Sequence, residues 1–147
     1  MAKTNKTMVI ASGYFNPLHK GHIEYLNRSK ALGDFLYVIV NNDAQRQMKG
    51  SNPFMEEKER ALVIQNLKSV DAVIVSIDND NRLVENTIEF IYNWRCNEFD
   101  NFIFTNGGDQ TEYTIGEREI CEKLGIKMVF GLGDKIQSSS TLIKNSK

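Results

Sequence analysis

Hydrophobic residues gather in five short runs along the chain, and polar or mixed segments separate these runs. The run at residues 34–42 reads DFLYVIVNN and is almost continuously apolar rather than alternating. Such continuity is typical of a strand that is covered on both faces. We therefore expect five buried strands, at residues 7–12, 34–42, 71–77, 101–106 and 126–133.

Each strand is followed by a stretch with helical periodicity. The stretch at 21–33 places Ile23, Leu26 and Leu32 on one side and ends at Gly33, a usual helix stop. Equivalent stretches lie at residues 54–70, 81–96, 114–125 and 139–145. Regular alternation of this kind predicts the α/β class: a doubly wound, mostly parallel five-stranded sheet of the Rossmann-like type, formed by one domain over residues 1–147. In such sheets ligands bind at the carboxyl ends of the strands, where the strand order reverses.

Composition narrows the class of protein further. Of the 147 residues 41% are hydrophobic and 25% are charged, with a formal net charge of −1. This balance does not favour nucleic acid or a membrane surface as partner, and no apolar run has membrane-spanning length. Cys96 and Cys121 have no metal-ligand spacing, so we expect reduced thiols in a soluble, cytoplasmic protein.

The turn after the first strand, GYFNPLHKGH, holds both histidines of the chain. Gly13 lets the backbone turn closely, and the N–H groups of the following helix offer an anion site. His19 and His22 lie three residues apart, with Gly21 between them, and can share one side of the first helical turn. The pair suits a phosphate chain. A metal site would need further ligands, which this turn lacks. The alternative without a ligand is structural: one histidine caps the helix and the other belongs to the core.

This turn resembles the HxGH signature of the nucleotidyltransferase superfamily, here formed by residues 19–22. The similarity is strongest to the branch of the glycerol-3-phosphate cytidylyltransferases and heptose-phosphate nucleotidyltransferases. It covers nearly the whole chain, because further segments follow in the order and spacing of that branch. These segments read SKALGD, VNNDA, LKSVDAVIV, NGGD and SSST.

The resemblance implies a reaction in which a phosphate oxygen of an acceptor attacks the α-phosphorus of a nucleoside triphosphate and pyrophosphate leaves. No general base is needed, because the acceptor phosphate is already ionised. His19, His22 and Lys49 would be the catalytic residues, with Lys49 on a loop. Mg²⁺ would arrive with the triphosphate rather than on protein ligands. A homodimer is also implied.

The same resemblance assigns binding residues. The acceptor phosphate would lie near Lys68 and Arg82, although both could equally be surface charges. The nucleotide-binding residues would follow the first, fourth and fifth strands: Gly13, Tyr14, Phe15, Gly21, Asn106, Gly108, Asp109, Ser139, Ser140 and Thr141.

Three departures leave the substrates open. Asn16 stands where cytidylyltransferases usually have aspartate, Asn106 replaces the lysine of the heptose branch, and the C-terminal arginine of the glycerol branch is missing, with Lys135 nearby. Transfer of CMP to glycerol 3-phosphate or a sugar phosphate is slightly favoured. The alternatives are adenylyl transfer from ATP to a sugar- or vitamin-type phosphate, a non-catalytic nucleotide-binding regulator on the same fold, and a flavodoxin-like redox or receiver domain.

Overall fold

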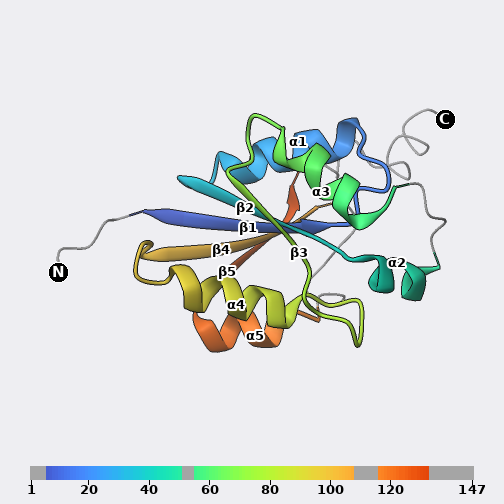
Figure 1. Ribbon diagram of the computed structural model, residues 1–147. Coiled ribbons are helices and arrows are strands. Elements are labelled where there is room, and N and C mark those ends of the chain that lie inside the picture. Colours follow the sequence, from blue (N-terminus) through green and yellow to red (C-terminus); the bar gives the residue numbers. More distant parts are fainter. Residues whose placement is uncertain (1–5, 51–54, 108–115, 133–147) are drawn as a thin grey trace, which may run out of the picture.

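The computed structural model describes residues 6–50, 55–107 and 116–132, and these form one twisted sheet with helices on both faces (Figure 1). All strands are parallel, in the order β3-β2-β1-β4-β5. The order reverses between β1 and β4, as in other doubly wound sheets. The strands are β1 (Thr7–Gly13), β2 (Phe35–Val40), β3 (Ala72–Val75), β4 (Asn101–Gly107) and β5 (Lys127–Leu132).

The helices divide between the two faces of the sheet. In Figure 1, α1 and α3 lie above the sheet, α4 and α5 lie below it, and α2 stands beyond the end of β2. The helices are α1 (Lys20–Lys30), α2 (Asp43–Lys49), α3 (Glu57–Gln65), α4 (Glu85–Arg95) and α5 (Arg118–Leu124). None of the helices in the described part of the chain is long and apolar enough to cross a membrane.

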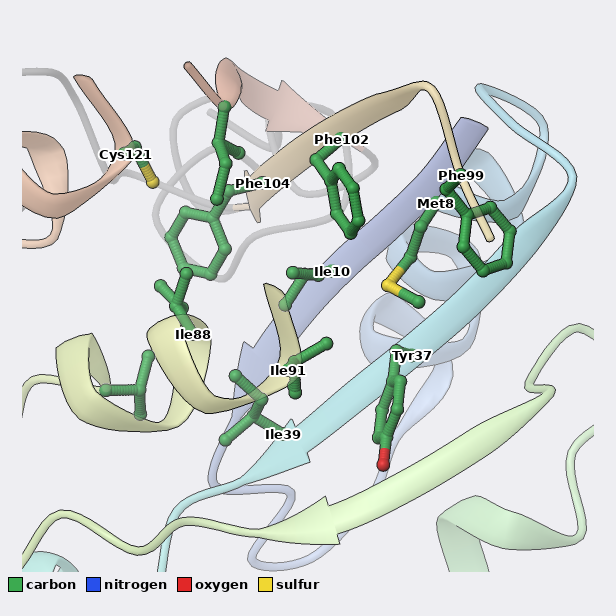
Figure 2. Packing of buried hydrophobic residues seen from close by; sticks show 12 residues of the cluster. Met8, Ile10, Tyr37, Ile39, Ile88, Ile91, Phe99, Phe102, Phe104 and Cys121 are labelled. Carbon is green, nitrogen blue, oxygen red and sulfur yellow. The ribbon is translucent and has the colours of Figure 1, made fainter. Parts of the chain in front are cut away.

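Two hydrophobic clusters fill the spaces between sheet and helices. One lies between the sheet and helices α4 and α5, where Met8, Ile10 and Phe104 of the sheet meet Ile88 and Ile91 of α4 (Figure 2). The other packs the opposite face against α1 and α3, with Leu26 and Ile64 from these helices. Because both faces are covered, the central strands β1 and β2 are apolar at nearly every position, which explains the continuous runs in the sequence.

The predicted fold class is confirmed, and the strands lie where the runs predicted them. The helices differ more. The predicted helix at 54–70 is only Glu57–Gln65, because Asn66 ends it and turns follow. The segment before α4 is a loop, closed in part by an Asn81 side chain that accepts from the Leu83 amide. Helix α2 was not predicted, and the expected helix at 139–145 lies outside the described residues.

A buried polar network holds α1 against the point where the strand order reverses. Tyr25 donates its hydroxyl to the Thr105 carbonyl at 2.9 Å, and Ser29 Oγ lies 2.9 Å from Thr105 Oγ1. Ser29 and Thr105 are fully buried. These bonds tie α1 to the end of β4 and so determine where the turn after β1 stands relative to the sheet.

Candidate functional site

The two histidines lie together at the first turn of α1. His19 is the N-cap, and its Nδ1 accepts from the Gly21 amide at 3.1 Å. His22 Nδ1 accepts from the His19 amide at 3.2 Å, so the two side chains form a reciprocal capping box. Their rings stack, with centroids 3.8 Å apart and planes at 30°. The prediction that both share one side of the turn is confirmed, and capping is part of what each histidine does.

This capping pattern also determines what the imidazoles can offer a ligand. Since both Nδ1 atoms accept backbone hydrogen bonds, a neutral ring carries its proton on Nε2, and this N–H can donate to a ligand. Burial, together with the charges of His19 and Lys49, lowers the pKa of His22 to about 4. His22 is therefore a neutral hydrogen-bond donor at physiological pH.

Phe15 gives the turn its shape. Its backbone is in the left-handed region, at φ 50, and its ring is buried against His22 in an edge-on contact at 5.0 Å. A Cβ on Gly13 would lie 2.7 Å from Phe15 Cζ. Gly13 is thus required because the ring of Phe15 folds back over it. Phe15 supports His22 through this ring contact.

Lys49 lies on the other side of the turn, in the last turn of α2 rather than on a loop as predicted. Its Nζ is 4.4 Å from the centroid of the Tyr14 ring, a cation–π contact. Its charge also contributes to the lowered pKa of His22. Tyr14, His22 and Lys49 therefore surround one region at the carboxyl end of β1.

Arg60 is the residue that joins the segments around this region, and sequence reasoning did not find it. Its side chain is completely buried in α3. Nη1 donates to the carbonyls of Tyr14 at 2.8 Å and Asn41 at 2.7 Å, Nη2 to Asp43 at 2.8 Å, and Nε to the Met55 carbonyl at 3.0 Å. One guanidinium thus connects the turn after β1, the end of β2, and the starts of α2 and α3.

Helix α2 holds the loop that carries Arg82. Asn42 caps α2, and its Nδ2 donates to the carbonyls of Ser76 and Asp78. Gln45, fully buried, donates to the carbonyls of Asn81 and Leu83 on either side of Arg82. The exposed Arg82 is therefore mounted on an anchored backbone, close enough to Tyr14 to affect the pKa of its hydroxyl.

The end of β4 and the start of α5 complete the edge. Asn106 is the next-to-last residue of β4 and is 8% exposed. Glu117 precedes α5, is also buried, and accepts from the Val84 amide at 3.0 Å; burial raises the pKa of its carboxyl group. Further predicted nucleotide-binding residues lie outside the described part of the chain: Gly108, Asp109, Ser139, Ser140 and Thr141.

Lys68 is the predicted site residue that the structure does not bring to this edge. It lies between α3 and β3, before the strand begins, whereas the histidines follow the end of β1. The neighbouring Asp71 accepts from the Leu36 amide near the start of β2. Lys68 is therefore at the amino end of the sheet, opposite the other candidates within this chain.

A signal for part of the missed structure was present in the sequence. Asn42 and Gln45 are three residues apart directly after a strand, the spacing of a capping box, and both capping bonds are formed. Arg60 had no such signal, because three of its four acceptors, on Tyr14, Asn41 and Asp43, are distant in the sequence. The described residues contain no group of three His, Cys, Asp or Glu side chains able to hold a metal ion.

Comparison with known proteins adds to this geometry. A family model described as cytidylyltransferase-like matches residues 10–145. The chain is 36% identical over 125 residues to the bifunctional protein HldE of Syntrophotalea carbinolica, covering 84% of this chain and 23% of that protein. It is 34% identical over 124 residues to HldE of Geotalea uraniireducens, covering 82% and 23%. The chain thus spans about a quarter of the length of these relatives.

Among solved structures, the chain is similar to the lipopolysaccharide core biosynthesis protein from Thermoplasma volcanium. The TM-score is 0.67 and the sequence identity is 32%, and the match covers 87% of this chain and 98% of that one. This neighbour is therefore almost fully matched by the present chain, in contrast to the longer bifunctional relatives.

Proposed function

The chain belongs to the cytidylyltransferase-like family of nucleotidyltransferases, and on that premise we propose that it transfers the adenylyl group of ATP to a small sugar phosphate. A phosphate oxygen of the acceptor forms a bond to the α-phosphorus of ATP. The bond from the α-phosphorus to the bridging oxygen breaks, and pyrophosphate leaves with the electron pair.

The observation that carries the proposal is the histidine pair over the start of α1. Negative charge builds on the oxygens between the α- and β-phosphorus as the bond breaks. Two Nε2–H donors are held in place before the reaction, because both Nδ1 atoms are bonded to the backbone of the same turn. Donors organised in advance stabilise such charge without reorganisation. Mg²⁺ bound to the triphosphate would neutralise further charge on the pyrophosphate.

Two further cationic side chains, Lys49 and Arg82, are placed so that each can bind a different substrate. Lys49 lies beside Tyr14 and close to His22, where a triphosphate held by the histidines can meet it. Arg82 lies on a different element, the anchored loop after β3, close enough to Tyr14 to act on its hydroxyl, and is available for the phosphate of the acceptor. In-line displacement needs this separation, since the attacking and leaving oxygens stand on opposite sides of the α-phosphorus.

ATP is preferred over CTP because of the relatives and one motif. The sequence alone slightly favoured CMP transfer, but the curated relatives are HldE proteins, which belong with the heptose-phosphate branch of the resemblance, and this supports adenylyl transfer to a sugar phosphate. The segment FNPLHKGH also leans toward adenylyltransferases, with Asn16 in place of the aspartate that cytidylyltransferases carry.

The test is pyrophosphate release from ATP, CTP, GTP and UTP, each with Mg²⁺ and a panel of sugar and polyol phosphates. We expect release from ATP with a sugar phosphate and its loss in His22→Ala. Arg118→Ala, a change in an exposed ion pair on α5, is the control and should keep full activity. Release from CTP instead would replace adenylyl by cytidylyl transfer. Nucleotide binding without release from any triphosphate would make the chain a non-catalytic binding protein.

A further inference from the structure

Two buried polar atoms at the carboxyl edge of the sheet have no hydrogen-bond partner among the described residues. They are the hydroxyl oxygen of Tyr14 and the amide nitrogen Nδ2 of Asn106. Leaving a buried donor unsatisfied is costly, and in native proteins such groups are rare. Polar atoms of this kind at the ligand-binding edge of a doubly wound sheet are expected to meet a bound molecule.

The register of the sheet determines which way Asn106 points. Thr105 pairs with Ala11 of β1, and its side chain meets Ser29 of α1 on one face. Phe104 lies in the opposite cluster, under α4 and α5. By the alternation of side chains along a strand, Asn106 follows Phe104 to the face of α4 and α5. It does so at the end of β4, where the pairing with β5 shifts register between Thr105 and Gly107.

The Tyr14 hydroxyl lies among charged groups that come from both faces of the sheet. Its pKa is raised chiefly by burial, and the charges of Arg82, Glu117 and Arg60 act on it. Arg82 and Glu117 lie just before α4 and α5, and the Glu117 carboxylate joins the two helices through the Val84 amide. The histidines instead stand on α1, which covers the other face. The edge therefore has two sides, and Tyr14 stands between them: Lys49 lies over its ring, and Arg82 and Glu117 act on its hydroxyl.

The chemistry of Tyr14 and Asn106 indicates whether they bind a phosphate or a hydroxyl group of a ligand. The Tyr14 hydroxyl and the Asn106 amide carry no charge, so a phosphate is held better by the Arg82 guanidinium than by these two groups. A hydroxyl group both donates and accepts, and so suits an amide donor, a phenol that can do either, and a nearby carboxylate. In the heptose branch that this chain resembles, a lysine precedes the Gly-Gly-Asp turn, whereas this chain has the neutral Asn106. The substitution removes a positive charge from this side and keeps a donor.

Resting on the proposed function, we infer that Tyr14 and Asn106 determine acceptor specificity by binding hydroxyl groups of a sugar or polyol phosphate whose phosphate lies at Arg82. This moves both side chains from the nucleotide, to which the resemblance assigned their positions, to the acceptor. The nucleotide keeps the histidine side of the edge.

The experiment measures binding by calorimetry for wild type, Tyr14→Phe and Asn106→Leu. The probes are α-D-mannose 1-phosphate, α-D-glucose 1-phosphate, D-ribose 5-phosphate and sn-glycerol 3-phosphate, with methyl phosphate as the probe that has no hydroxyl groups. ATP with Mg²⁺ is measured in parallel. Tyr92→Phe, near the amino edge, and Asn93→Leu, on the exposed side of α4, are matched control variants.

We expect at least one hydroxyl-bearing probe to bind wild type about tenfold more tightly than methyl phosphate. Each site variant should lose roughly 3- to 10-fold of that preference, the effect of one hydrogen bond, with ATP affinity unchanged within about twofold. The Tm of each unliganded variant shows whether it folds, and Tyr14→Phe, which removes one oxygen atom, keeps the test valid if Asn106→Leu unfolds.

Three results would overturn the inference: no probe binding better than methyl phosphate, a preference that survives both substitutions, or variants that weaken ATP rather than the sugar phosphate. In each of these cases ATP-dependent pyrophosphate release with a sugar phosphate would leave the proposed function intact. Absence of release in wild type with every acceptor would overturn the proposed function, and the inference with it.

Discussion

The two edges of the sheet are built from the same parallel strands but treat their polar groups differently. At the amino edge two carboxylates bond to the starts of neighbouring strands. Asp34 accepts from the Thr7 amide at 2.9 Å, and Asp71 accepts from the Leu36 amide at 2.8 Å and pairs with Lys30. At the carboxyl edge Arg60 connects four segments, while the Tyr14 hydroxyl and the Asn106 amide have no partner among the described residues.

The difference shows that polar side chains without a role in holding the fold together lie at the carboxyl edge. Bonds at the amino edge close the loops onto the neighbouring strand and leave those carboxylates engaged. The carboxyl edge is held rigid by buried residues behind it, so that histidines, lysine and amide can be presented to a ligand. Loops on a rigid support are a common place for binding and catalysis. Substitutions at the two edges should therefore separate stability from activity.

The largest effect is expected from Arg60→Met, which removes the completely buried guanidinium and leaves several carbonyls and the Asp43 carboxylate without their donor. We expect the free energy of unfolding to fall by about 3–5 kcal/mol, measured by urea denaturation. The exposed Arg118→Ala should change it by less than about 1 kcal/mol. Equal effects of the two substitutions would mean that the Arg60 network does not hold the edge together.

Next in size is the loss of activity in His22→Ala. Removing one preorganised donor lowers kcat by about 10²- to 10³-fold in comparable sites. The Tm should change little, because His19 continues to cap α1. Initial rates of pyrophosphate release test this, with His22→Asn as a variant that keeps an N–H donor and should recover part of the rate. Near wild-type kcat in His22→Ala would remove the histidine pair from the proposed mechanism.

A smaller contrast is expected between the two lysines. Lys49→Ala should lower kcat/KM by roughly tenfold, because a charge-assisted contact to phosphate is lost. Lys68→Ala, at the amino edge, should change kcat/KM by less than about twofold if each chain acts alone. The resemblance placed Lys68 at the acceptor, so a large loss in Lys68→Ala would show that a second copy brings this lysine to the site. Steady-state kinetics with both substrates decide between these outcomes.

The last prediction concerns pH, and it affects stability only below physiological pH. The pKa of His22 is lowered to about 4 from an ordinary value near 6.5, so the folded protein binds fewer protons than the unfolded chain between these values. His22 therefore contributes stability that is complete above pH 6.5 and is lost as the pH falls toward 4. NMR titration of the two imidazoles, assigned with His22→Asn, should show one ring titrating near pH 4. A His22 midpoint at or above 6.5 would contradict the neutral-donor interpretation.

Most of the fold could be predicted because its signals are local. The run from Phe35 to Val40 is apolar throughout, and Gly125 ends α5 in the left-handed conformation that glycine readily adopts. Helix α2 was missed because it has only seven residues and its face is polar. Its capping residues donate hydrogen bonds to the loop after β3 instead of packing in a hydrophobic core, so hydrophobic periodicity could not detect the helix.

The site was predicted in part, and the limits have a physical reason. His19 and His22 are close in sequence and belong to one helical turn, so their association follows from helix geometry. Gly13 was predicted as a nucleotide-binding residue. In the structure, the ring of Phe15 occupies the place where a Cβ on Gly13 would lie. The stack of Lys49 on Tyr14 joins residues 35 positions apart, and only the packing of α2 on the sheet brings them together.

By itself the sequence determined the α/β class, the order of the strands along the chain, and a turn that holds two histidines at the start of a helix. These properties depend on periodicity and on residues within a few positions of one another. The tertiary structure decided that Arg60 joins four segments, that Lys68 is remote from the histidines, and that the Tyr14 hydroxyl and Asn106 Nδ2 are buried without a partner among the described residues. Such relations arise from strand order and register, which bring distant segments together only when the sheet forms.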